Sequence, residues 1–130
     1  MATKLQLRNV HKSFGSNAVC NGIDLSVAQG ELVCLIGASG SGKSTILRCI
    51  NLLEPIDDGE ILLDGVDISA PDLDPRMIHR RVGLVFQSFN LFPHMTALDN
   101  VLLAPRRVLR LKEDDNRARA EALFRRFGLA

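Results

Sequence analysis

One stretch of eight residues combines a flexible backbone, a cation and a hydroxyl group in a pattern that suits polyphosphate binding. It reads GASGSGKS over residues 37–44 and matches the spacing G-x-x-x-x-G-K-[ST] in full. Glycines let successive backbone N–H groups point into one concavity, which can surround phosphate oxygens. Lys43 would bring an ammonium group to the β- and γ-phosphates, and the Ser44 hydroxyl would ligate Mg²⁺. The stretch therefore predicts a site for a polyphosphate and its metal ion.

The alternative is a flexible turn that contains lysine and serine by chance. At ordinary residue frequencies such a match arises in about one of 200 chains of this length. The apolar run over residues 32–36 precedes the loop and is typical of a strand buried on both faces. Residues 43–53 follow with apolar positions at helical spacing, so the loop would open a helix whose N-terminus attracts anions. This order of strand, loop and helix favours phosphate binding.

Hydropathy patterns elsewhere predict the elements that position this loop. Alternation, with a slip before Val10, predicts a strand around residues 5–10, and similar patterns or apolar runs predict strands over 19–27, 60–63, 66–68 and 82–86. Asp64-Gly65 predicts a tight hairpin turn. Helices are predicted over residues 97–109 and 113–127, with Gly128 ending the second. Strands and helices together predict an α/β fold.

Composition and charge argue against several functions. The chain has 130 residues, and its 16 Lys and Arg against 15 Asp and Glu leave a net charge of only +1. Without a basic face, and without Trp or Tyr for base stacking, no nucleic-acid partner is expected. No apolar run reaches the length of a signal peptide or of a membrane helix. We therefore expect a soluble polypeptide that could still dock on a membrane protein.

The three cysteines are odd in number and share no metal-ligand spacing. Cys34 lies inside the apolar run 32–36, where a small buried thiol is the expected state. Free thiols of this kind fit a reducing cytosol better than a disulfide framework.

Four short blocks around the phosphate loop carry a resemblance to a known family. They read LRNVHKSFG over residues 7–15, GELV over 30–33, DGEI over 58–61 and VGLVFQ over 82–87. These blocks resemble those of ABC-type ATPases, and the likeness extends from near residue 5 to residue 130. It implies a P-loop NTPase fold of the α/β class over residues 1–130. That fold has a mixed sheet with an antiparallel β subdomain and flanking helices, and here it stops before the signature region.

Two further blocks are similar to those of ATP-binding subunits of polar amino-acid importers. They read LRCINLLE over residues 47–54 and FNLFPHMTALDNV over 89–101. This narrower resemblance implies ATP and Mg²⁺ as cofactors, with permease subunits in the membrane and a second nucleotide-binding subunit as partners. It also implies a cytoplasmic location, peripheral on the inner face of the plasma membrane.

The resemblance implies a role for each matching residue. Phe14 would stack on adenine, although a core phenylalanine is the alternative from sequence alone. Gln87, following the predicted strand 82–86, would be the Q-loop glutamine that reaches Mg²⁺ and the attacking water, whereas an ordinary surface glutamine is its alternative. Ser44 and Gln87 would be the metal ligands. The nucleotide-binding set is Phe14, Gly37, Ala38, Ser39, Gly40, Ser41, Gly42, Lys43, Ser44 and Thr45.

Residues 88–101 resemble the segment that contacts the membrane subunits. Its expected apolar anchors are Phe89, Leu91, Phe92 and Met95. A loop that is folded and buried on its own domain is the alternative, and the sequence leaves the choice between them open.

The second half of the family's domain supplies an LSGGQ-type signature, a Walker B aspartate, a catalytic glutamate and a switch histidine, and none occurs in these residues. We therefore expect a fragment, a truncated gene product or a piece of a larger ATPase, which binds ATP without efficient turnover. One rival is a nucleotide-binding remnant that never turns over. Another is the N-terminal lobe of a DNA-repair or chromosome ATPase, but residues 113–127 lack the sustained heptads of the coiled coil expected there.

Overall fold

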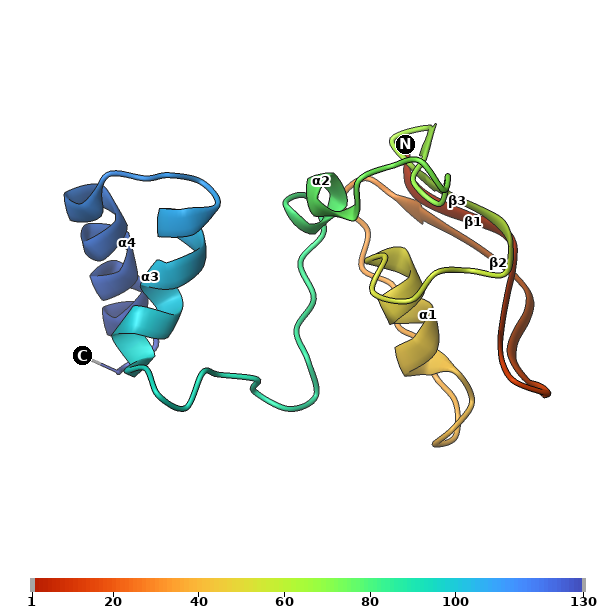
Figure 1. Cartoon of the computed structure of the whole chain (residues 1–130), viewed down its shortest axis with the longest axis horizontal. Helices are drawn as coiled ribbons and strands as arrows, with labels where there is room; N and C mark the ends of the chain where they lie inside the picture. The colour runs from red at the N-terminus through yellow and green to blue at the C-terminus, as the bar shows by residue number, and fades with distance from the viewer. Residues whose placement is uncertain (1, 130) are drawn as a thin grey trace. The chain divides into compact units, whose positions relative to one another are not determined.

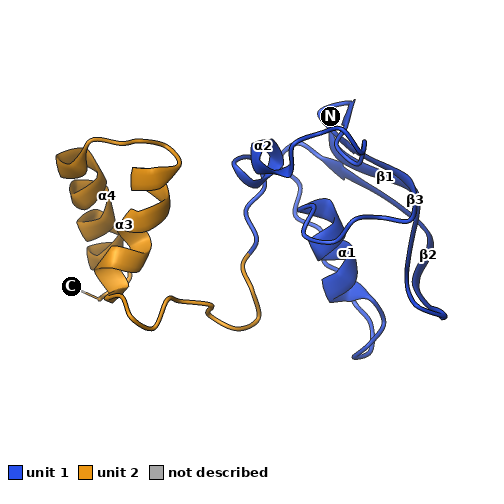
Figure 2. Cartoon of the chain, in the orientation of Figure 1, with its two compact units in different colours: residues 1–84 blue, residues 85–130 orange. Residues whose placement is uncertain are grey.

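The computed structural model describes residues 2–129 and contains two compact units, residues 1–84 and residues 85–130 (Figure 2). Unit 1 contains β1 (Thr3–Phe14), β2 (Asn17–Ala28), α1 (Lys43–Ile50), β3 (Asp58–Leu63), β4 (Val66–Asp67) and α2 (Pro75–His79). Unit 2 contains α3 (Ala97–Arg107) and α4 (Glu113–Arg126) (Figure 1). Among the described residues, none of these helices has the length and apolar character that a bilayer span requires.

The sheet of unit 1 is antiparallel and has the strand order β2-β1-β3-β4. β1 lies inside it, so that Leu7 is opposite Leu25 of β2 and also opposite Ile61 of β3. The register of β1 shifts between Leu7 and Val10, where Asn9 has a φ of 47° and its N–H donates to Asp24 Oδ1 at 2.9 Å. This shift confirms the slip in alternation that the sequence showed at the same place.

The hydrophobic core of unit 1 lies between one face of this sheet and α1. Leu7 and Val10 of β1 and Ile61 of β3 are almost completely buried. They meet α1 through the residues of its apolar stripe, Ile46, Cys49 and Ile50. α1 begins at Lys43 as predicted, but it ends at Ile50 rather than residue 53, because Leu52 takes a left-handed conformation with a φ of 56°.

Two predicted strands do not form. Residues 32–36 and 82–86 have no strand assignment, and Leu32, Ile36 and Val85 are 88%, 96% and 96% exposed. Cys34 is exposed as well, so the prediction of a buried thiol is wrong. The physical reason is that an extended segment becomes a strand only when its N–H and C=O groups pair with a neighbour. Within residues 2–129 neither run has such a ladder, so the sheet here is the antiparallel part alone.

Unit 2 is a pair of helices joined by a buried hydrogen bond. Thr96 caps α3 by accepting from Asp99 N–H at 3.0 Å, and the buried Asn116 of α4 donates from Nδ2 to the Leu102 carbonyl of α3 at 2.9 Å. α3 ends at Arg107 rather than residue 109, and α4 ends at Arg126 rather than residue 127. Gly128 has a φ of 70°, which confirms its predicted role in ending α4.

The short helix α2 was not predicted from the sequence. Asp74 caps it by accepting from Arg76 N–H at 3.0 Å, and Pro75 occupies its first position. An Asp-Pro pair is a recognised signal for a helix start, so the local sequence contained the information.

Gly59 of β3 is predicted to be the least replaceable glycine of the sheet. Its φ is 94°, and a Cβ atom at this position would lie 2.4 Å from the Asn9 carbonyl oxygen of β1. We expect Gly59→Ala to lower the free energy of unfolding by more than about 2 kcal/mol, because strain and steric overlap add. Urea unfolding followed by far-UV circular dichroism measures the change.

Gly65→Ala is the matched control, because Gly65 has a φ of 79° but no neighbouring atom within 4 Å of the place that a Cβ atom would take. It should cost about 1 kcal/mol, from backbone strain alone. Equal losses for the two variants would contradict the role assigned to close packing at Gly59.

Candidate functional site

The glycine-rich loop enters α1 through a left-handed residue. Gly42, the residue before the helix, has a φ of 94°, and a Cβ atom there would lie 3.0 Å from both the Val19 carbonyl oxygen and Val19 Cγ1. Glycine is therefore required here for two reasons, the backbone conformation and the close approach of β2. The loop is held against β2 at the point where the helix begins.

The N-terminus of α1 offers backbone N–H groups that no side chain caps. No side-chain hydrogen bond satisfies them, and no acidic residue occupies the first turn. The first N–H groups of a helix have no partner within the helix, and together with the helix dipole they favour an anion. Ser44 and Thr45 lie in this first turn, directly after Lys43.

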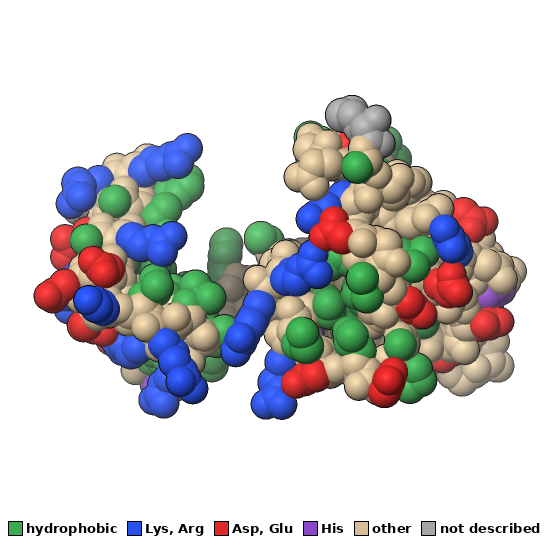
Figure 3. Space-filling model, turned by 90° about the horizontal axis from the view of Figure 1, so that it is seen from above, with side chains coloured by type: hydrophobic (Ala, Val, Ile, Leu, Met, Phe, Trp, Pro, Cys, Tyr) green, Lys and Arg blue, Asp and Glu red, His purple; other side chains and the backbone are tan. Residues whose placement is uncertain are grey.

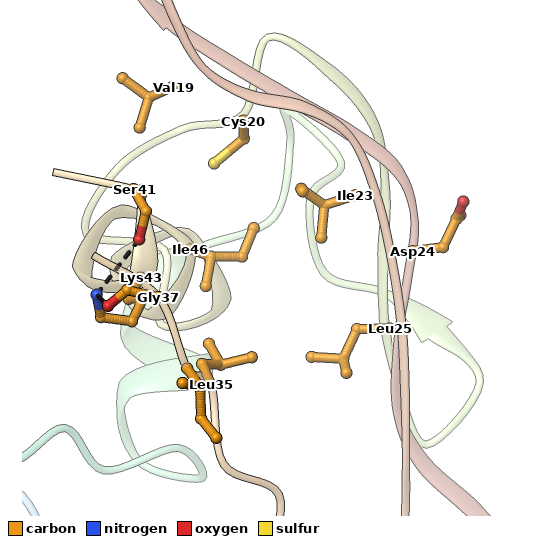
Figure 4. Close-up of a pocket in the computed structure, with 12 residues that line it drawn as sticks. Val19, Cys20, Ile23, Asp24, Leu25, Leu35, Gly37, Ser41, Lys43 and Ile46 are labelled. Atoms are coloured by element: carbon orange, nitrogen blue, oxygen red, sulfur yellow. Dashed lines mark hydrogen bonds between the residues drawn. The ribbon is translucent and has the colours of Figure 1, made fainter. Parts of the chain in front are cut away.

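The Lys43 ammonium group lies against the same loop. It donates to the carbonyl oxygens of Gly37 and Ala38, the second at 2.7 Å. It also donates to Ser41 Oγ at 3.3 Å (Figure 4). No ion pair between Lys43 and a carboxylate is present in the described part of the chain. A positive charge and an uncapped helix end therefore converge on one loop, and this combination suits a phosphate group.

A cavity of about 280 Å³ lies beside the loop, between β2 and α1. Ser41 and Lys43 form part of its polar edge, while its wall is mostly apolar (Figure 4). The apolar lining consists of Val19, Cys20, Ile23, Leu25, Leu35, Ile36 and Ile46. The sequence predicted the strand over residues 19–27 but not that it forms this wall, because pattern alone does not say which strand lies next to the loop.

Asp24 is a carboxylate at the border of this cavity that the sequence reasoning did not single out. Figure 4 shows its side chain turned away from Lys43 and Ser41. Asp24 Oδ1 accepts from the Asn9 N–H at 2.9 Å, so the carboxylate stabilises the irregular part of β1. In this structure Asp24 therefore binds the backbone of β1 at Asn9 and does not face the phosphate loop.

Phe14 is the last residue of β1 and is 47% exposed. It is not part of the buried core, so the alternative of a core phenylalanine does not describe it. The Lys12 ammonium lies 5.2 Å from the centre of its ring. The turn that follows Phe14 and the glycine-rich loop both extend to the lower end of unit 1 in Figure 1. Stacking of the ring on a base stays a prediction.

Gln87 belongs to unit 2, whereas the phosphate loop belongs to unit 1. Its side chain is exposed, and it follows residues 82–86, which have no strand assignment. A contact between Gln87 and a metal ion at the loop stays a prediction.

Residues 88–101 fold around Asn100 of α3. The Asn100 side chain accepts from Phe92 N–H at 2.8 Å and donates to the Thr96 carbonyl at 2.8 Å. Phe89, Leu91 and Phe92 are 93%, 61% and 50% exposed, and Met95 is half-buried. The segment is therefore ordered by its polar residues and leaves most of its apolar side chains outside, unlike a loop buried on its own domain.

The glycine-rich loop ends in a lysine and leads into an uncapped helix. This combination defines the P-loop class of nucleotide-binding folds. Comparison with known families is consistent with this class and narrows it. Residues 20–130 match the family described as ABC transporter. The chain belongs to the ABC transporter family, as its sequence blocks predicted.

Similar proteins of known role agree with the narrower resemblance. The glutamine transport ATP-binding protein GlnQ of Escherichia coli K12 is 48% identical over 97% of this chain and 52% of its own length. The arginine transport ATP-binding protein ArtM of Bacillus subtilis 168 is 41% identical over 96% of this chain and 52% of its own. The chain thus spans about half the length of the curated relatives it matches.

A solved structure confirms the predicted fold class. The dimeric structure of an ATP-binding cassette in a post-hydrolysis state, bound to ADP and Pi, matches with a TM-score of 0.80 and 34% identity. The match covers 93% of this chain and 56% of that one.

The cysteines provide a chemical test of this part of the structure. Burial raises the pKa of the Cys20 thiol, and burial together with the neighbouring Cys20 raises the pKa of Cys49 to about 11. At pH 8, about one in a thousand Cys49 thiols would be ionised, and only the thiolate reacts. We expect iodoacetamide at pH 8 to label the exposed Cys34 well before the other two, as measured by peptide mass mapping.

Raising the pH should speed labelling of Cys20 and Cys49 in the folded chain, because their raised pKa values leave them protonated until alkaline pH. In denaturant all three thiols should react at similar rates, which controls for reagent and sequence effects. Protection of Cys34 equal to that of Cys20 would show that residues 32–36 are covered in solution.

Proposed function

We propose that this chain binds Mg-ATP and forms the nucleotide-binding part of the ATP-binding subunit of an amino-acid importer. The observation that carries the proposal is the convergence of the Lys43 ammonium and the uncapped N-terminus of α1 on one glycine-rich loop. Such a loop can neutralise several phosphate charges at once, which neither the lysine nor the helix end does alone.

The proposed roles follow from the chemistry of each side chain. Lys43 interacts with the β- and γ-phosphates, and backbone N–H groups of the loop surround their oxygens. Ser44, in the first turn of α1, contributes a hydroxyl oxygen to Mg²⁺, and Gln87 contributes an amide oxygen. The exposed ring of Phe14 stacks on adenine, and Thr45 completes the set at the helix end.

The transported solute and the partners are proposed from the relatives and from exposed apolar residues. Relatives over nearly the whole chain are ATP-binding proteins of glutamine and arginine transport, which supports a polar amino acid as the solute. The exposed Phe89, Leu91 and Phe92 suit contact with permease subunits. Figure 3 shows apolar side chains at the surface of each unit. We further propose a second nucleotide-binding subunit and a position on the inner face of the plasma membrane.

Neither rival explanation has a feature of its own in its favour. The relatives and the narrower sequence blocks point to transport rather than to a DNA-repair or chromosome ATPase. α4 spans only Glu113–Arg126 and is ended by a left-handed Gly128, which does not support a coiled coil that continues from it. A remnant that binds nucleotide without turnover would have the same loop geometry. Phosphate release by the longer protein distinguishes it from a working subunit.

Lys43→Ala should weaken Mg-ATP binding by about 10- to 100-fold, because it removes charge-assisted hydrogen bonds to phosphate. The fold should be retained, since Lys43 contacts the loop and is not a core residue. Isothermal titration calorimetry measures the affinity, and circular dichroism checks the fold. Lys4→Ala, which removes an exposed lysine paired with Asp64, is the control. Unchanged affinity in a folded Lys43→Ala variant would disprove the phosphate-loop assignment.

The 130-residue chain by itself should bind Mg-ATP without steady hydrolysis. Hydrolysis needs a base or a positioned group at the attacking water, and general-base assistance contributes about 10²–10⁴-fold to the rate. The carboxylate at the border of the cavity, Asp24, is hydrogen-bonded to Asn9 and turned away from Lys43 (Figure 4). Phosphate release should stay at background and appear when residues corresponding to the rest of the relatives' length are supplied. Turnover by the 130-residue chain that disappears in Lys43→Ala would contradict the prediction that this chain does not hydrolyse ATP. Absence of turnover in the longer protein as well would favour the nucleotide-binding remnant.

A further inference from the structure

Lys12 occupies an unusual position for a charged residue. It lies on β1 two residues after the fully buried Val10, so both side chains are on the core face of the strand, and Lys12 is only 7% exposed. Burying an ammonium group is costly unless it is closely paired. Its nearest carboxylate oxygens, Glu54 Oε2 and Asp57 Oδ1, lie at 3.9 and 3.8 Å, beyond hydrogen-bond length. Two ion pairs this long contribute little to the free energy of folding. Stability alone therefore gives little reason for a lysine here instead of an apolar side chain of similar length.

The two carboxylates tie the end of β1 to the segment that connects α1 with β3. Asp57 accepts from Ser13 N–H at 2.6 Å through Oδ2, and its own N–H donates to the His11 carbonyl at 2.8 Å. Glu54 lies in the same segment, shortly after the end of α1. The position of the Lys12 ammonium is therefore set by its own buried stem and by the two acids of the segment that follows α1.

The ammonium held in this way faces the Phe14 ring. Lys12 and Phe14 are two residues apart on β1 and share one face of the strand. The distance of 5.2 Å from the ammonium to the ring centre is within the range of a cation–π interaction. Because the ring remains 47% exposed, the cation lies beside it without covering it.

We propose that Lys12 is a positioning residue for the nucleotide base. It holds the Phe14 ring in place for stacking, and Glu54 and Asp57 hold Lys12. This inference rests on the proposed function, in which Phe14 stacks on adenine. If the inference is right, Lys12 affects binding of the base and not binding of the phosphates. A residue that only supports the fold would affect both.

The test compares two ligands that differ in the base. Mg-ATP contains the base and the triphosphate, whereas Mg-tripolyphosphate has no base. Lys12→Met keeps a stem of similar length and removes the charge. It should weaken Mg-ATP binding by about three- to tenfold and change Mg-tripolyphosphate binding by less than about twofold, as measured by calorimetry on the 130-residue chain. Lys12→Arg should restore most of the affinity for Mg-ATP, since the cation is kept.

Lys4→Met is the matched control, because it makes the same change on the same strand at an exposed lysine without a ring beside it. It should leave both affinities unchanged. A double variant gives the sharpest evidence. In a Phe14→Ala background, Lys12→Met should have no further effect on Mg-ATP binding, because the ring through which it acts is gone.

Each remaining outcome identifies a different error. If Phe14→Ala weakens Mg-ATP binding but Lys12→Met does not, Lys12 has no positioning role and the stacking proposal stands. If Phe14→Ala has no effect, the stacking part of the proposed function is wrong and the inference fails with it. Equal weakening of both ligands by Lys12→Met would show a structural role alone. If Lys12→Met does not fold, Glu54→Gln is tested with the same two ligands. Removing the charge of Glu54 takes away one of the two acids that hold the Lys12 ammonium. It should therefore weaken Mg-ATP binding more than Mg-tripolyphosphate binding, and equal effects on the two ligands would contradict the proposal.

Discussion

β1 is hydrogen-bonded along both of its edges, to β2 on one side and to β3 on the other, and this double pairing determines the geometry of unit 1. Its core face contributes Leu7 and Val10 to the packing on α1, which fixes where that helix lies on the sheet. The pairing also requires a glycine at position 59, where β3 passes within contact distance of the irregular part of β1. At its far end the strand brings Lys12 and Phe14 to the surface edge of the core.

The phosphate loop depends on this frame rather than on its own residues alone. Gly42 closes against the carbonyl of Val19, so that β2 sets the position from which α1 starts. Because the helix packs through Ile46, Cys49 and Ile50, its N-terminus is directed at the loop and its C-terminus at the segment that contains Glu54 and Asp57. The uncapped N–H groups lie at the N-terminal end of this helix, and the acids that pair with Lys12 follow its C-terminal end.

The chain uses its apolar residues in two ways. The core residues of unit 1 are buried between a sheet and a helix, whereas residues 32–36 of the same unit and residues 88–92 of unit 2 leave large side chains exposed. Scattered exposed apolar residues are ordinary on protein surfaces, but runs of them indicate that a surface contacts something else. In residues 88–101 the polar side chain of Asn100 organises the backbone, so the exposed phenylalanines do not depend on burial for their order. This arrangement is consistent with a contact surface.

Local sequence determined those features whose physical cause lies within a few residues. The phosphate motif, the helix start at Lys43, the turn at Asp64-Gly65 with positive φ at both residues, and the end of α4 at Gly128 were all predictable in this way. Tertiary structure alone decided which extended segments become strands, because a ladder needs a neighbour that hydropathy cannot identify. Residues 32–36 and 82–86 have the pattern of strands and are unpaired here, whereas Lys12 has the pattern of a surface lysine and is buried. Its burial follows from the register shift in β1 and from the carboxylates of Glu54 and Asp57, which lie far along the chain and which no local pattern contains.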